Sequence, residues 1–178
     1  MSWSQIFLDI EFKQAGPIKG ESEFAGFEDQ IVLLDFDWSM ALNKQQGGAA
    51  AKRRVTMKDL TIKKRFDSAS VKLLNCLNNR DPIVKARVTV AHRIADASGG
   101  GDSMRRAFVL EVTKARLESI SLDMTEEGKS TILQEDVEIR FTKVRIERYP
   151  MDETGKYSNK AMVYESEATD NLEMNEAR

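Results

Sequence analysis

The chain has 178 residues, a formal net charge of -2, one histidine and one cysteine. This length suits one domain with a substantial hydrophobic core and is short for two domains. The slightly negative charge argues against a general nucleic-acid binder, which is usually clearly basic. A single cysteine permits neither an intramolecular disulfide nor a metal site made of several cysteines, and we expect no metal and no cofactor.

Targeting signals are missing from the amino-terminal sequence. Residues 1–6 lack the basic and apolar regions of a signal peptide. No uninterrupted apolar run approaches the roughly 20 residues that span a bilayer. We therefore expect the protein to fold in the cytoplasm, to insert into no membrane, and to leave the cell, if it does, without a cleaved signal.

Period-2 alternation predicts two strands in the first quarter of the chain. The first covers residues 6–12, where every second residue is large and apolar. The second covers residues 31–42, where the even-numbered side chains from 32 onward form an apolar face and Asp35, Asp37 and Ser39 form a polar one. Residues 43–54 contain no large apolar side chain, which predicts a long exposed loop.

The single predicted helix begins after a cap at Asp67. Val71, Leu74 and Leu77 follow at three-residue spacing, so we expect them to form its buried face. Pro82 ends the helix, because proline disfavours a helical conformation at the preceding residue.

Strands account for the rest of the chain. A phase shift within residues 55–62 indicates a β-bulge, and residues 83–94 alternate regularly. Two longer runs, 105–124 and 131–149, also shift phase, which lets long strands bend round the corner of a barrel. A last short strand is expected near residues 161–164.

About seven strands and one short helix predict a mainly β fold. We expect a single small β-barrel, made of two packed sheets, closed or nearly closed and flanked by the helix. This domain is placed at residues 1–166. Residues 167–178 continue an acidic run that starts at Glu165, and they are expected to form a disordered tail.

No cluster of residues points to a reaction. His92 is explained by packing in the core or at an interface, and Cys76 by packing. Asp35 and Asp37 could form an acid/base pair, but a solvated sheet face explains them more simply. The basic residues between 52 and 65 have little aromatic interleaving, which favours protein contact or a solvated face over nucleic acid.

Several segments share their sequence with one known family. They are Ile6-Phe7-Leu8-Asp9-Ile10, Gly20-Glu21-Ser22, Trp38-Ser39, the phrase Lys64-x-x-Asp67-x-Ala69-Ser70, and residues 83–90. Together, and in this order, they resemble the haemolysin-coregulated protein (Hcp) family, the tube subunits of the bacterial type VI secretion system. None of these motifs is catalytic, so the resemblance implies a scaffold and not an enzyme.

The resemblance implies a phage tail-tube-like barrel that assembles with its own copies. Six copies are expected to form a ring, and rings to stack into a tube with a wide lumen. A contractile sheath would expel this tube, which has a spike at its tip and carries effector proteins inside. The implied partners are therefore other copies, effectors, and the sheath and spike proteins, and the protein moves from the bacterial cytoplasm to the outside.

Two sets of residues receive roles through this resemblance. Ring stacking is assigned to the loop that contains Asn43, Lys44, Gln45, Gln46, Gly47, Gly48, Lys52, Arg53 and Arg54. The lumen is assigned to one of two polar strand faces, which bear Asp35, Asp37 and Ser39, or Lys85, Arg87 and Thr89.

Two other functions stay open. One is a monomeric binding module, such as an effector chaperone that kept the barrel but lost ring assembly. The other is an enzyme that acts through His92 or through the Asp35 and Asp37 pair.

Overall fold

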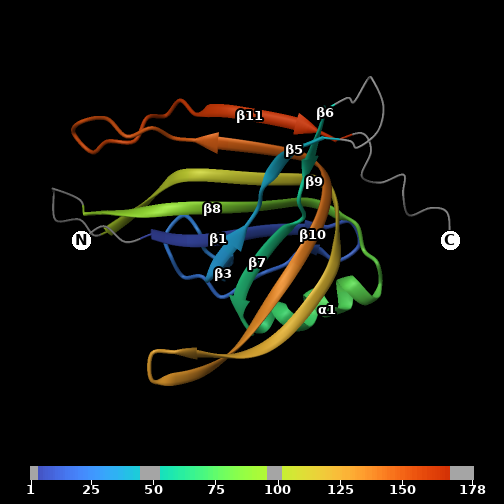
Figure 1. The fold of residues 1–178 in the computed structure, drawn as a ribbon. Helices are drawn as coiled ribbons and strands as arrows, with labels where there is room; N and C mark the ends of the chain where they lie inside the picture. The colour runs from blue at the N-terminus through green and yellow to red at the C-terminus, as the bar shows by residue number, and fades with distance from the viewer. Residues whose placement is uncertain (1–3, 45–52, 96–101, 169–178) are drawn as a thin grey trace.

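The computed structural model describes residues 4–44, 53–95 and 102–168. Within these ranges the chain is mainly β, with eleven strands and one helix (Figure 1). The elements are β1 (Ser4–Phe12), β2 (Gly16–Pro17), β3 (Ile31–Leu33), β4 (Asp35–Asp37), β5 (Met40–Lys44), β6 (Arg53–Met57), β7 (Leu60–Arg65), α1 (Ser68–Asn78), β8 (Ile83–Ala95), β9 (Asp102–Glu127), β10 (Ser130–Arg148) and β11 (Met162–Glu167).

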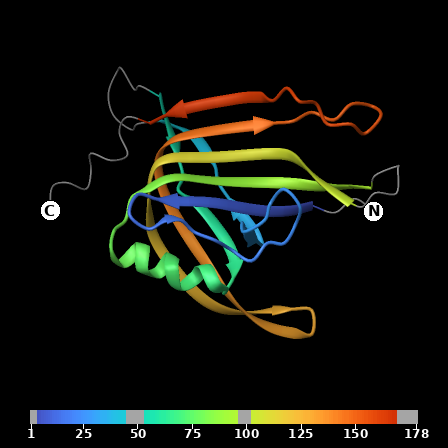
Figure 2. The same ribbon diagram turned by 180° about the vertical axis from the view of Figure 1, so that it is seen from behind.

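One antiparallel sheet holds nine of the described strands. Seven of them follow the order β2-β1-β8-β9-β10-β7-β4, and the other two, β3 and β11, each pair with one strand of this series. Strand β3 lies beside β1, and β11 lies beside β10. The two halves of β10 have different neighbours, since residues 134–139 pair with β7 and residues 143–148 pair with β11. The sheet therefore folds over on itself, and the opposite view shows α1 packed at one side of it (Figure 2).

The long strands β9 and β10 bend where the sequence predicts a change of phase. In β9 the buried side changes between Val112 and Ala115, and Lys114 between them has φ +51°. Farther along, the register of the β9–β10 ladder shifts between Glu138 and Ile139. An extra residue in a strand bends it and reverses the side that each following residue faces, so these irregularities let one sheet surround a core.

The prediction of a barrel is only partly right. The sheet curls, but in the described residues no continuous ladder closes it. The strands that would close it, β3 and β4, are three residues each, and they pair with different neighbours: β3 with β1, and β4 with β7.

The predicted strand over residues 31–42 is wrong in length, and over residues 31–34 it is wrong in the face that it buries. Phe36 and Trp38 pack against the core, as the alternation predicts. The segment is divided into β3, β4 and β5, and Ile31 and Leu33 are buried, where the alternation had placed Val32 and Leu34. The chain changes face at Leu34, whose amide donates to the carbonyl of Lys63 (2.8 Å). Long-range hydrogen bonding at this bend outweighs the local alternation.

The predicted loop over residues 43–54 begins and ends inside strands. Asn43 and Lys44 belong to β5, and Arg53 and Arg54 belong to β6, with which β5 pairs from Met40 to Lys44. Residues 45–52 lie outside the described residues. The predicted bulge before Leu60 is instead a break between β6 and β7.

Helix α1 begins at its predicted cap but buries a different face. The Asp67 side chain accepts a hydrogen bond from the amide of Ala69, and the Ser70 side chain accepts one from the amide of Asp67. Ala69, Leu73 and Cys76 are buried, whereas Val71 is 56% exposed. The small residues at 69 and 70 let the helix lie close to the sheet, and this contact decides the buried face.

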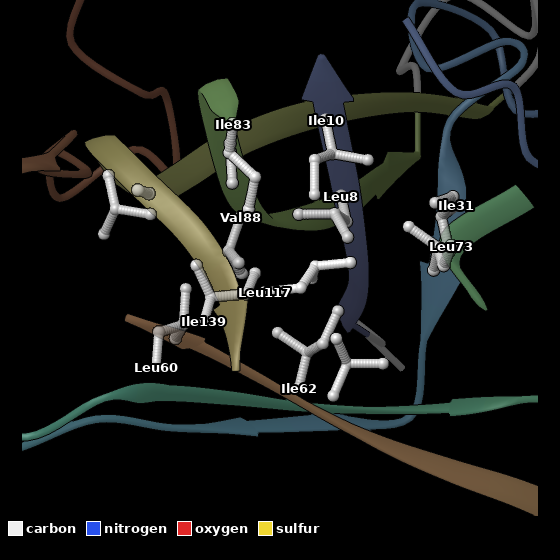
Figure 3. Close-up of a cluster of buried hydrophobic side chains, with 14 of the residues drawn as sticks. Leu8, Ile10, Ile31, Leu60, Ile62, Leu73, Ile83, Val88, Leu117 and Ile139 are labelled. Atoms are coloured by element: carbon white, nitrogen blue, oxygen red, sulfur yellow. The ribbon is translucent and has the colours of Figure 1, made fainter. Parts of the chain in front are cut away.

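The core lies inside the curled sheet. Leu8 and Ile10 of β1, Val88 of β8, Ile62 of β7 and Ile139 of β10 meet there (Figure 3). Burial of such apolar side chains is the main stabilising contribution to a fold of this kind. In the described part of the chain, no helix has the length and apolar character needed to cross a membrane.

Candidate functional site

A row of alternating charges crosses five strands on the side of the sheet that faces away from the core. In register the row reads Asp9 on β1, Arg87 on β8, Glu111 on β9, Arg145 on β10 and Glu165 on β11. We call this surface, with the neighbouring Lys85 and Lys143, the charged face. Directly opposed residues of opposite charge attract each other across a sheet.

The charges of this row are joined by ion pairs. Arg87 Nε lies 2.7 Å from Glu111 Oε2, and Arg145 Nη1 lies 3.1 Å from Glu165 Oε2. The pKa of the Glu165 carboxyl is lowered by its hydrogen bonds to Lys143 and then to Arg145. The charged face is consequently polar, and its charges are neutralised by neighbouring charges of opposite sign. Such a surface binds apolar polypeptide segments weakly.

Two predicted assignments change on this face. Glu167, the first residue of the predicted tail, is not part of a free tail, because it is the last residue of β11 and pairs with Lys114. The predicted lumen residues Lys85 and Arg87 are partly exposed here, but Thr89 is only 2% exposed.

The burial of Thr89 follows from a small second core. Its neighbour on β1 is Phe7, whose ring stacks on Phe27 with centroids 4.4 Å apart. Phe7, Phe27 and Ala91 form a buried cluster that covers this end of the sheet. The alternation along β8 does not show that residues from another segment cover this end of the sheet. For this reason the sequence predicted a solvated face for Thr89.

The other predicted polar face lies on β4 and its neighbour β7. Asp35 and Asp37 are exposed, as is Ser39 just beyond the strand. Asp37 pairs with Lys58 (3.4 Å), and Lys63, which opposes Asp35, pairs with Asp136 (3.3 Å). We call this surface the β4 face. It is narrower than the charged face, because β4 has only three residues.

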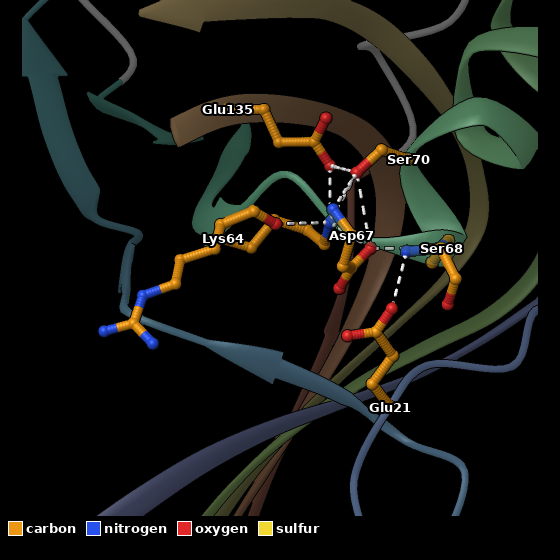
Figure 4. Close-up of polar contacts among 8 residues, drawn as sticks. Glu21, Lys64, Asp67, Ser68, Ser70 and Glu135 are labelled. Carbon is orange, nitrogen blue, oxygen red and sulfur yellow. Dashed lines mark hydrogen bonds and ion pairs between the residues drawn. The ribbon is translucent and has the colours of Figure 1, made fainter. Parts of the chain in front are cut away.

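A fully buried lysine holds the junction between β7 and α1. Lys64 Nζ donates to Glu135 Oε1 (2.6 Å), Asp67 Oδ1 (2.7 Å) and Ser70 Oγ (2.9 Å), as Figure 4 shows. The Lys64 and Glu135 side chains are both 0% exposed. We call Lys64, Asp67, Ser70 and Glu135 the Lys64 cluster.

The Lys64 cluster corrects one prediction and explains a motif. The basic run had placed Lys64 on a contact surface or a solvated face, which is wrong. The phrase Lys64-x-x-Asp67-x-Ala69-Ser70 instead provides an ammonium, a helix cap and a hydroxyl to one network. Such a network ties the start of α1 to β7 and β10, because each member loses a partner if any element moves.

The Gly20-Glu21-Ser22 turn supports the same junction. A Cβ at Gly20 would lie 2.4 Å from the carbonyl oxygen of Gln30, so only glycine fits this close approach. Glu21 Oε1 accepts a hydrogen bond from the amide of Ser68 at the start of α1 (2.9 Å), as Figure 4 also shows. This bond lowers the pKa of Glu21.

The residues considered for catalysis are explained by packing. His92 Nδ1 lies 3.0 Å from Ser4 Oγ, and its ring stacks on Tyr157. Cys76 is buried, and this burial raises the pKa of its thiol. In the described ranges, no group of three His, Cys, Asp or Glu side chains could hold a metal ion.

Exposed apolar side chains gather on three features of the surface, besides others that lie singly elsewhere. The β5–β6 hairpin, the β9–β10 tip and the edge strand β11 each present several of them. They are Met40, Leu42 and Val55; Leu122, Met124 and Leu133; and Met162, Val163 and Tyr164. Exposed apolar groups on an edge strand or a projecting hairpin are typical of surfaces that contact a protein partner. The alternation over residues 31–42 had instead placed Met40 and Leu42 on an apolar face directed to the core.

Comparison with known proteins gives a consistent family. The family model described as type VI secretion system effector, Hcp, matches residues 7–147. No curated protein sequence matches the chain significantly.

Solved structures share the fold at low sequence identity. A mutant of the Hcp1 protein from E. coli EAEC 042 has a TM-score of 0.72 at 15% identity, covering 92% of this chain and 97% of that one. Hcp1 from Salmonella typhimurium (TM-score 0.62, 21% identity, 93% and 95% covered) and the secreted protein Hcp3 from Pseudomonas aeruginosa (0.62, 18%, 93% and 99%) are also similar. Because the family match spans most of the sequence and the fold agrees with it, the chain belongs to the Hcp family of the type VI secretion system, whose members are structural tube proteins and not enzymes.

Proposed function

We propose that this protein is an inner-tube subunit of a type VI secretion system that assembles into six-membered rings. The rings stack into a tube that carries effector proteins in its lumen and is expelled by contraction of a surrounding sheath behind a spike. The observation that carries this proposal is the family match over residues 7–147. The protein would therefore be made in the bacterial cytoplasm and secreted with the tube.

The surface of the single subunit supports assembly. Among the described strands, β11 pairs only with β10, and Met162 on it is 69% exposed. An open strand edge with apolar side chains is a hazard unless another chain covers it. In a closed ring every subunit would meet its neighbours through the same two surfaces, so all such edges would be covered equally.

The charged face is our candidate for the lumen. It presents a row of charges in register across five strands, whereas the β4 face ends at a strand of only three residues. A channel through which proteins travel needs a wide polar lining without apolar patches. Lys85 and Arg87 would then line the channel, and Asp35, Asp37 and Ser39 would face outward.

The mass of the protein in solution tests the ring directly. Six subunits of 20.1 kDa give about 120 kDa, and each contact in a stable ring should bury about 800 Å² per partner. Multi-angle light scattering of the purified full chain at micromolar concentration should give this mass. A single sharp peak of one subunit would reject the ring and favour a monomeric effector chaperone.

Stacking is proposed to use the segment around the β5–β6 hairpin. Reversal of Lys52, Arg53 and Arg54 to Glu should leave the mass of single rings unchanged and reduce stacking or secretion. The matched control reverses Lys13, Lys72 and Lys129, three exposed lysines elsewhere. Secretion that is unchanged in the native host would exclude this segment from stacking.

Cysteine labelling distinguishes the two candidate lumen faces. Arg87→Cys on the charged face and Ser39→Cys beside β4 are each made with Cys76→Ala, which removes the one native thiol. A bulky maleimide at position 87 should block effector co-purification from assembled rings, and one at position 39 should not. The opposite result would assign the lumen to the β4 face.

A further inference from the structure

A basic cleft lies at the end of the molecule where the loop of residues 149–159 meets the start of β9. Its volume is about 810 Å³, and no Asp or Glu lines it in the described part of the chain. Three cations and three aromatic rings stand out among the lining residues. They are Arg105, Arg106 and Lys156, and Phe27, Tyr149 and Tyr157.

The loop and the Tyr157 wall of the cleft are held in place by contacts that do not use the three charged groups. Asp152 Oδ1 accepts hydrogen bonds from the amides of Thr154 and Lys156 (both 2.9 Å), which fixes the loop. The Tyr157 ring stacks on His92 with centroids 6.0 Å apart. The cleft is thus shaped by the subunit itself, so a ligand would bind without first ordering the loop.

Within the described ranges, the cations of the cleft have no ion-pair partner. Among the described residues, neither Arg105, Arg106 nor Lys156 has an acidic group within salt-bridge distance, although most cations of the charged face do. Arg106 lies over the Phe27 ring, 5.9 Å from its centroid. Unpaired cations with aromatic walls are suited to a segment that carries carboxylates and apolar side chains.

The chain itself contains a segment with this chemistry. Residues 169–178 include Asp170, Glu173 and Glu176, with Leu172 and Met174 between them, and only one basic residue. They also lie beyond residue 147, where the family match ends. We propose that the basic cleft binds the acidic segment 169–178 of another copy of this chain.

The course of β11 favours another copy as the source of the bound segment, because the segment begins at the far end of β11 from the cleft. The first residue of the strand, Met162, pairs with Arg148 next to the cleft, and its last, Glu167, pairs with Lys143. Six strand residues at about 3.3 Å each carry the chain roughly 20 Å away from the cleft, toward the end that bears the β5–β6 hairpin (Figure 1). To reach the cleft of its own copy, the segment would have to run back along this distance. In a head-to-tail stack, the segment of one copy would instead face the cleft of the next copy.

This contact rests on the proposed function, since stacked rings provide the head-to-tail neighbour. It is heterologous, because the two partners contribute different surfaces, and it can therefore repeat from ring to ring. In such a stack, each ring would bind the six acidic segments of the next.

Peptide binding tests the cleft. The probe is a fluorescein-labelled peptide of residues 169–178, and the protein is the full chain with its own segment neutralised by Asp170→Asn, Glu173→Gln and Glu176→Gln. Fluorescence anisotropy should show saturable binding that weakens at least about tenfold when Arg105, Arg106 and Lys156 are reversed to Glu. Reversal of Lys13, Lys72 and Lys129 is the control and should have little effect. Equal loss in both proteins, or equal binding of a peptide with neutralised acids, would overturn the proposal.

Mixed disulfides test whether the contact joins two copies. One chain carries Ser158→Cys in the cleft, a second carries Glu173→Cys, and both carry Cys76→Ala. Oxidation of the mixture should give a disulfide between the two chains, and a bond that forms only within a doubly substituted chain would contradict the proposal. Light scattering on the same samples distinguishes failure of this contact from failure of the proposed ring. A six-subunit mass without the mixed disulfide rejects only the contact between the cleft and the segment. A one-subunit mass rejects the ring.

Discussion

The Lys64 cluster and the charged face use the same residue types for different purposes. Lys64 and Glu135 are both 0% exposed, whereas the Arg87 and Glu111 side chains of the charged face keep 36% and 20% of their surface exposed. A buried charge that loses its partner cannot be solvated by water, whereas an exposed one can. The cluster should therefore contribute to the stability of the fold. The charged face should instead determine which molecules bind to the surface.

Loss of the buried ammonium is expected to have the largest effect. Lys64→Met leaves Glu135 buried without its cation, and the free energy of unfolding should fall by about 3–5 kcal/mol. Urea denaturation at fixed protein concentration measures this change. The matched control is Lys63→Met on the same strand, whose partly exposed pair with Asp136 should be worth less than about 1 kcal/mol. Equal losses of unfolding free energy in the two variants would show that the buried and the exposed ion pairs contribute equally to stability.

A substitution at Gly20 tests the turn that supports the cluster. Gly20→Ala places a methyl group 2.4 Å from a backbone oxygen, so the turn must shift, and we expect a loss of about 1–3 kcal/mol. Thermal unfolding by circular dichroism is the measurement. Gly26→Ala is a useful contrast, since its Cβ meets no atom within 4 Å but its φ is +82°, and it should cost about 1 kcal/mol through backbone strain alone. A neutral Gly20→Ala would show that the close approach is not needed.

The ion pairs of the charged face should contribute little to stability. A double-mutant cycle of Arg87→Ala and Glu111→Ala is expected to give a coupling energy below about 1 kcal/mol. The mass of the assembled protein should not change. A coupling as large as the effect of Lys64→Met would mean that the charged face is part of the stabilising framework.

The smallest effect is expected from Glu21, at the exposed border of the cluster. Its folded-state pKa is lowered below the ordinary value of 4.5, mainly by the hydrogen bond from Ser68. The stabilisation is therefore fully present above pH 4.5 and is lost as the pH falls through the folded-state pKa. Glu21→Gln should flatten the acid side of a plot of stability against pH, because it lowers stability slightly at neutral pH and leaves it nearly unchanged at low pH. Glu23→Gln, at an exposed position two residues away, is the matched control.

The local sequence determined the secondary structure where burial is simple. The alternation over residues 6–12 predicted β1, Asp67 predicted the start of α1, and the phase shifts predicted the bends of β9 and β10. These signals are reliable because a helix cap and a change of strand face depend on residues close in sequence. The motifs also identified the family, because the order of several short segments is more specific than any one of them.

Tertiary structure decided which faces are buried. Val71 is exposed on α1 although its spacing predicts burial, Thr89 is buried beside Phe7 although its strand face was expected to be solvated, and Lys64 is in the interior although it stands in a basic run. Each depends on contacts between segments far apart in the chain, which period and propensity do not contain. For the same reason, only the folded chain brings Arg105, Arg106 and Lys156 into one cleft, since β9 and the loop of residues 149–159 meet through the pairing of the sheet.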